Sequence, residues 1–218
     1  MSKKIMFNDK FDLTQAVLEG RKTMTRRIFY IPDKLAPYLD IDDTFDIVDN
    51  CIIWKDKSDN IRMTFEPKYK VGEVIAIAQS YMDVDRFHRK GKNAAYLEYL
   101  DSILPELKLY PGWGNKMFVK ADLMPHHIKI TGIKVERLQD ISDEDCLKEG
   151  IVKQEVISDE SPFLYAYDAF LDGDNKYFAS RWFKSPKEAF AVLIDKVSGK
   201  GVFQSNPFAF AYEFRLTD

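Results

Sequence analysis

Two segments near the end of the chain carry the clearest patterns of hydrophobic and polar residues. Residues 185–199 predict a helix that begins at the capping residue Ser185, with Pro186 in its first turn, and ends at Gly199. Its apolar side chains recur at helical spacing: Phe190, Leu193, Ile194 and Val197. Residues 208–216 alternate instead, which predicts a strand whose apolar side chains point one way: Phe208, Phe210, Tyr212, Phe214 and Leu216.

Earlier in the chain, short strand and helix patterns follow one another without regular alternation. Strands are expected near residues 23–30, in a hairpin at 43–65, and at 74–78, 117–119 and 128–138. Helices are expected at 12–20, 94–104 and 142–150, the first capped by Asp12 and the last by Ser142. This irregular order predicts an α+β fold with a mostly antiparallel sheet.

Composition and charge are those of an ordinary globular protein. Of the 218 residues, 45% are hydrophobic and 31% are charged, so residues 1–218 are expected to form a single domain with a good core. The pI near 5.7 argues against a general binder of duplex DNA, whose affinity rests on excess cations. No apolar run has the length that spans a bilayer, and no secretory signal is recognisable. We therefore expect a cytoplasmic protein with no membrane contact.

The cysteines and histidines give no indication of a bound metal. Cys51 and Cys146 have no short-range partner, which favours a reducing compartment and roles as small buried residues. The three histidines, His88, His126 and His127, lack cysteine or carboxylate partners at metal-ligand spacing. The chain also has no glycine-rich loop of the kind that holds a nucleotide cofactor, so we expect neither a metal nor a cofactor.

A concentration of cations stands out against the acidic net charge of −3. It lies in the stretch Glu19-Gly20-Arg21-Lys22-Thr23-Met24-Thr25-Arg26-Arg27, which we call the basic corner. Gly20 is a typical helix end, and the following residues have the pattern of a strand, so the stretch is expected to turn from helix to strand. Lys22 and Arg27 could there face a shared ligand, a polyanion, a nucleotide or a polar carbonyl. The alternative is a solvated basic turn near a helix C-terminus.

The basic corner resembles the hallmark of a known family. Gly20, Lys22, Thr25 and Arg27 have the spacing Gly-x-Lys-x-x-x-x-Arg, which is similar to that of ASCH domains of the PUA-like superfamily. Residues 71–80, 128–151 and 205–214 resemble further blocks of phage and prophage members, in order. The resemblance implies a mostly antiparallel β-barrel with flanking helices, with insertions near 41–67, 81–110 and 152–185. It also implies that the protein binds RNA, a nucleotide or a modified nucleoside.

A narrower resemblance implies chemistry. The corner is similar to that of the small bacterial amidohydrolases that remove the acetyl group from N(4)-acetylcytidine, and it implies catalytic roles for Lys22, Thr25 and Glu149. A threonine hydroxyl needs an adjacent base, which Lys22 supplies if burial or nearby cations lower its pKa. Glu149 would then protonate the leaving amine, and Arg27 would stabilise an oxyanion. Glu149 ends its helix, where the macrodipole disfavours a carboxylate, and this is a further hint of another role.

Two hypotheses therefore remain open, an amidohydrolase and a binding module without catalysis. In the binding module Arg21, Lys22, Arg26 and Arg27 contact phosphates. Four more residues are expected to line the cleft in either case. Tyr81, Trp113 and Asn206 belong to blocks that flank it in the family, and Gln79 is a polar residue that closes an apolar strand. The sequence specifies no oligomeric state.

Overall fold

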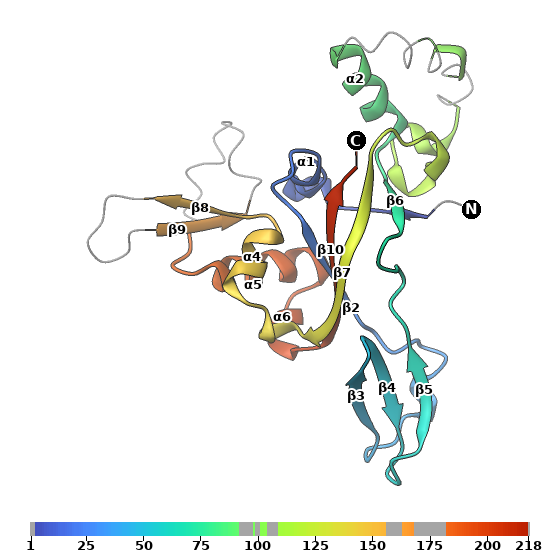
Figure 1. Cartoon of the computed structure of the whole chain (residues 1–218), viewed down its shortest axis with the longest axis vertical. Coiled ribbons are helices and arrows are strands. Elements are labelled where there is room, and N and C mark those ends of the chain that lie inside the picture. Colours follow the sequence, from blue (N-terminus) through green and yellow to red (C-terminus); the bar gives the residue numbers. More distant parts are fainter. Residues whose placement is uncertain are drawn as a thin grey trace.

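The computed structural model describes residues 3–91, 98, 101–103, 109–155, 163–167 and 182–217. Within this part of the chain, the largest sheet has five strands in the order β1-β6-β7-β10-β2. Their bounds are β1 Lys4–Ile5, β6 Val74–Ile77, β7 His127–Arg137, β10 Phe208–Leu216 and β2 Met24–Ile28. β1 pairs with β6 in parallel, and every other pairing in this sheet is antiparallel (Figure 1). The structure thus confirms a mixed α+β fold.

The long strands β7 and β10 form the middle of this sheet and much of the core. β10 pairs with β7 on one side and β2 on the other, with an irregularity between Glu213 and Phe214. The predicted strand at residues 208–216 is confirmed, but burial is not confined to one face. Phe208 to Tyr212 are all buried, because both faces of the strand are covered.

The sheet curls so that its two edge strands approach each other. Arg27 lies on the edge strand β2, and its guanidinium donates to the carbonyl of Met6, directly after the opposite edge strand β1, at 2.7 Å. The same guanidinium lies 5.7 Å from the ring centroid of Phe7. Closure into the barrel that the resemblance implies stays a prediction.

Helices lie beside the curled sheet. They are α1 Leu13–Leu18, α4 Asp143–Lys148, α5 Pro186–Ser198 and α6 Val202–Ser205, with α2 Tyr81–Gly91 farther off (Figure 1). Two predicted caps are confirmed, since the Ser142 hydroxyl accepts from the amide of Asp145 and the Ser185 hydroxyl from that of Glu188. The predicted cap of α1 is wrong. Asp12 precedes that helix in a left-handed conformation and makes no side-chain capping bond.

Two smaller sheets extend from the main body. β3 Thr44–Val48, β4 Cys51–Lys55 and β5 Ile61–Phe65 form a three-stranded antiparallel sheet where a hairpin was expected. The extra turn falls at Asp49 and Asn50, both of which have positive φ angles, as tight hairpins require. β8 Ile151–Glu155 pairs with β9 Phe163–Tyr167. Apart from Ile151, both sheets fall in segments that the resemblance leaves unmatched.

Short 3-10 helices connect these elements. They are η1 Asp9–Phe11, η2 Ala36–Tyr38, η3 Pro111–Trp113, η4 Lys116–Phe118, η5 Ala121–Leu123 and η6 Leu138–Asp140. The strand expected at 117–119 is wrong, because η4 occupies this stretch and the Asn115 side chain caps it by accepting from the amide of Met117. The predicted helix at 94–104 lies largely outside the described residues.

The remaining sequence expectations concern cysteines, metals and membranes. Cys51 and Cys146 are free thiols, and burial raises the pKa of Cys146 to about 12, as suits a small buried residue. Among the described residues no group of histidine, cysteine or carboxylate side chains is arranged to hold a metal ion. No helix in the same residues is long and apolar enough to cross a bilayer.

Candidate functional site

The basic corner turns from α1 into β2 and is fixed against the end of α4. Gly20 follows α1 with a φ of +73°, a conformation that glycine adopts without strain. The amide of Lys22 donates to the Ala16 carbonyl at 2.9 Å, and the amide of Thr23 donates to the Lys148 carbonyl at 2.9 Å. The second bond brings the corner next to the last turn of α4, and so places Lys22 beside Glu149.

Lys22 and Glu149 form a buried ion pair. The Lys22 ammonium donates to the Glu149 carboxylate at 2.6 Å and to its backbone carbonyl at 2.7 Å. The side chains are only 3% and 5% exposed. Burial lowers the pKa of Lys22, and the charge of Glu149 offsets part of that effect. The predicted meeting of these residues therefore occurs, with direct contact.

Arg26 is held by three carboxylates behind this pair. Its guanidinium donates to Glu149 at 3.0 Å, to Asp145 at 3.1 Å and, through Nε, to Glu136 at 2.9 Å. It also lies 5.9 Å from the ring centroid of Phe190 on α5. Burial opposes the charge, but Glu149 and Glu136 outweigh it and raise the pKa of Arg26. Arg26 is thus already saturated with anionic partners.

Arg27 has a different environment. Its contacts are the Met6 carbonyl and the Phe7 ring, and within the described chain no carboxylate lies within ion-pair distance of it. Burial lowers the pKa of Arg27, with opposing contributions from Tyr69 and Glu149, yet a guanidinium stays protonated at neutral pH. Among the described residues, no ion pair therefore neutralises the positive charge of Arg27.

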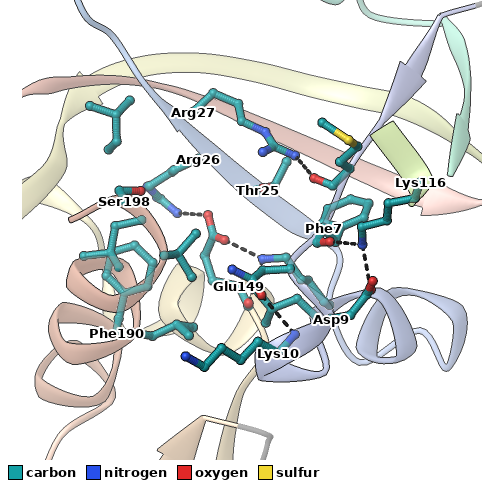
Figure 2. Close-up of a pocket in the computed structure, with 18 of the residues that line it drawn as sticks. Phe7, Asp9, Lys10, Thr25, Arg26, Arg27, Lys116, Glu149, Phe190 and Ser198 are labelled. Atoms are coloured by element: carbon teal, nitrogen blue, oxygen red, sulfur yellow. Dashed lines mark hydrogen bonds and ion pairs between the residues drawn. The ribbon is translucent and has the colours of Figure 1, made fainter. Parts of the chain in front are cut away.

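These side chains converge on one cavity of about 730 Å³, which we call the main pocket (Figure 2). β2 contributes Thr25, which is 5% exposed, and the corner and the end of α4 contribute Lys22 and Glu149. The remaining side chains of the lining come from the segment after β1, from η1, α1, β2 and the residues after β2, and from η4 and α5. They are Met6, Phe7, Asn8, Asp9, Lys10, Leu13, Arg26, Arg27, Ile28, Tyr30, Lys116, Phe190, Leu193, Ile194, Val197 and Ser198. The lining thus includes five cations and two carboxylates.

The Thr25 hydroxyl shares this pocket with Lys22 without being bonded to it. In the part of the chain that the structure describes, no hydrogen bond joins Thr25 to the Lys22 ammonium. Two of the three donors of that ammonium are directed at Glu149, which leaves one for another acceptor.

Five predicted ligand contacts do not line the main pocket. Arg21 is exposed and pairs with Glu19, and Asn206 lies at the end of α6, where its side chain accepts from the amide of Gln139. Gln79, Tyr81 and Trp113 lie beyond β6, where the Tyr81 hydroxyl accepts from the amide of Lys120. An ion pair engages Arg21, a bond to the backbone engages Asn206, and Tyr81 and Trp113 pack in a second cluster of buried residues. The buried amide oxygen of Gln79 has no hydrogen-bond partner among the described residues.

Residues from the start of the chain line the pocket and were not anticipated. Lys116 donates to the Asp9 carboxylate at 2.6 Å, to the Phe7 carbonyl and to the Thr14 hydroxyl. The bonds to Phe7 and Asp9 tie η4 to the segment after β1 and fix one wall (Figure 2). No local pattern in the sequence indicates it, because more than a hundred residues separate Lys116 from Phe7 and Asp9.

Comparison of the chain with known protein families, with curated proteins and with solved structures finds no match. The function of the main pocket therefore has to be inferred from its own residues.

Proposed function

We propose that the main pocket binds a nucleoside or nucleotide, free or as part of RNA, and that the phosphate of a nucleotide ligand lies at Arg27. The observation that carries this proposal is the environment of Arg27. Its guanidinium lines the pocket, is held in place by the Met6 carbonyl and the Phe7 ring, and has no carboxylate partner in the described chain. A positioned guanidinium with free donors is the usual protein partner of a phosphate.

The rest of the pocket suits the other parts of such a ligand. Phe190, Leu193 and Ile194 of α5 form an apolar wall, and the Phe7 ring stands on the opposite side of the cavity. Ligand sites typically combine such apolar walls with a few placed polar groups, and their volumes run from about 300 to 1,000 Å³. A base fits against the apolar wall, while polar groups near Lys22 and Thr25 meet its hydrogen-bonding edge.

Calorimetric titration with the four ribonucleoside 5′-monophosphates tests this proposal. Arg27→Ala should weaken the affinity of the best ligand by about tenfold or more, since hydrogen bonds between charged groups contribute roughly 1.5–3 kcal/mol. The affinity of Arg27→Lys should fall between those of wild type and Arg27→Ala, because lysine keeps the charge but lacks the planar guanidinium that donates two parallel hydrogen bonds. Arg21→Ala is the control, since Arg21 belongs to the same corner but lies outside the pocket. Equal affinities for Arg27→Ala and wild type would overturn the proposal.

A second candidate function is the hydrolysis of an N-acylated nucleoside, favoured by the 2.6 Å contact between Lys22 and Glu149. Transfer of one proton across this contact gives a neutral amine and a protonated carboxyl together. The Thr25 oxygen then bonds to the acyl carbon while its proton passes to Lys22. The carbon–nitrogen bond breaks as the amine takes the proton of Glu149, and water releases the acyl group from Thr25 as a carboxylic acid.

A further inference from the structure

A second cavity adjoins the main pocket and shares Arg27 with it. It has a volume of about 530 Å³, and we call it the adjoining pocket. Met6, Arg27, Ile28 and Tyr30 line both cavities. Arg27 therefore lies on their common boundary, where the two edges of the curled sheet approach each other.

The adjoining pocket is also cationic. Apart from Arg27, the described residues that line it include the cations Lys4 and Lys68 and one carboxylate, that of Glu66. The Lys4 ammonium donates to the carbonyls of Met117 and Val119 at 2.6 and 2.7 Å, and these are neutral acceptors. The Lys68 ammonium lies 5.4 Å from the ring centroid of Tyr69. Positive charge thus continues beyond the main pocket.

Aromatic rings accompany these cations. Tyr69 and Tyr212 pack edge to face with centroids 5.1 Å apart, and hydrogen bonds to the backbone fix both hydroxyls. Tyr30 belongs to both cavities and is 62% exposed, so one of its ring faces is open to a ligand. Tyr69 and Tyr212 are buried, so Tyr30 is the one of these three rings on which a base can stack, and a cation beside an open ring is a combination by which proteins hold single-stranded nucleic acid.

We propose that the two pockets together bind two successive nucleotides of single-stranded RNA, with the linking phosphodiester at Arg27. A phosphate held by Arg27 has one pocket on each side, and each volume lies in the range of a single small-ligand site. A mononucleotide fills only one of them. This inference rests on the proposed binding function of the main pocket and extends it to the substrate class.

The test compares each ribonucleoside 5′-monophosphate with the matching dinucleoside monophosphate, ApA, CpC, GpG or UpU, by calorimetry on the full chain. The dinucleotide of the preferred base should bind about tenfold tighter, since an added stacked base contributes roughly 1–3 kcal/mol. Lys68→Glu should remove this advantage and leave the monophosphate affinity within about twofold. Lys70→Glu is the matched control, an exposed lysine two positions away that does not line the pocket.

The outcomes separate the two proposals. Equal binding of monophosphate and dinucleotide would overturn the two-nucleotide site and leave the main pocket as a mononucleotide site. If Lys68→Glu and Lys70→Glu lose the same dinucleotide affinity, the loss reflects net charge and not the adjoining pocket. That result would overturn the inference too. Failure of wild type to bind any of these ligands would overturn the proposed function itself. If tetraglutamate competes with the bound monophosphate as strongly as the dinucleotide does, the two pockets are assigned to acidic peptides instead.

Discussion

The ammonium of Lys22 and the carboxylate of Glu149 lie 2.6 Å apart in the interior, although 127 positions separate them in the sequence. Each has a further bond that fixes its orientation, to the Glu149 carbonyl in one case and from Arg26 in the other. The attraction between buried charges compensates for their lost hydration only when the geometry is good. This contact therefore both stabilises the fold and shapes the site, because it joins the end of α4 to the basic corner.

The two partners of this ion pair should contribute unequally to the stability of the protein. Glu149→Gln removes the charge that faces both Lys22 and Arg26, and should lower the free energy of unfolding by about 3–5 kcal/mol. Lys22→Met should cost less, because Glu149 keeps Arg26 as its partner. Urea denaturation measures both, with Glu144→Gln on the exposed side of α4 as control. A larger loss for Lys22→Met than for Glu149→Gln would contradict this account.

Arg26 and Arg27 are adjacent in sequence, but we expect them to respond differently to substitution. Arg26→Met strands Glu136, Asp145 and Glu149 without their common cation, and should lower the free energy of unfolding by about 3–5 kcal/mol. Arg27→Met should cost less stability and more nucleotide affinity, and should flatten the dependence of that affinity on salt. Urea denaturation and calorimetry at several salt concentrations measure the two effects. Similar losses of stability in both variants would show that Arg27 is also mainly structural.

The acid side of the stability profile should depend on Asp145. Burial raises its pKa, but the hydrogen bond and charge of Lys134, with those of Arg26, hold it below the ordinary value of 3.8. A carboxylate with a lowered folded-state pKa stabilises the protein above its unfolded-state pKa, and this contribution is lost as the pH falls through the lower value. Asp145→Asn should therefore cost about 1.5–3 kcal/mol at pH 7, and this cost should shrink as the pH falls below 3.8. Unfolding measured from pH 2 to 7 checks this, with the exposed Asp143→Asn as control.

The sequence predicts those parts of the site in which local pattern determines position. The end of α1 just before Gly20 follows from residue type, as does the capping of α4 by Ser142. The meeting of Lys22, Thr25, Arg27 and Glu149 was expected from the family resemblance, and the structure places all four on the main pocket.

The structure differs from the sequence predictions where contacts between distant parts of the chain decide the role of a side chain. Arg26 was expected to contact phosphate, yet its guanidinium already donates to the carboxylates of Glu136, Asp145 and Glu149, which come from distant parts of the chain. Asn206 was expected near the ligand, although an asparagine with positive φ at a helix end is a common cap. The contribution of Lys116 depends on contacts with the start of the chain, which no spacing in the sequence encodes.

The hydrolytic candidate gives its own set of kinetic expectations with an N-acylated nucleoside such as N(4)-acetylcytidine as substrate. Thr25→Val should abolish turnover, and Thr25→Ser should keep a fraction, because it retains the hydroxyl that bonds to the acyl carbon. Glu149→Gln should lower kcat more than it raises KM, since protonation of the leaving amine matters only in the transition state. The mechanism needs the one proton that Lys22 and Glu149 share, so loss of that proton at high pH should lower kcat/KM. Because burial lowers the pKa of Lys22, the midpoint of this fall should lie below 10.5. Product release measured by liquid chromatography across pH 6 to 10 checks the series, with Arg21→Ala as the control outside the pocket. Ligand binding that is equal in wild type and Thr25→Val, without product from either, would eliminate hydrolysis and leave the pocket as a binding site.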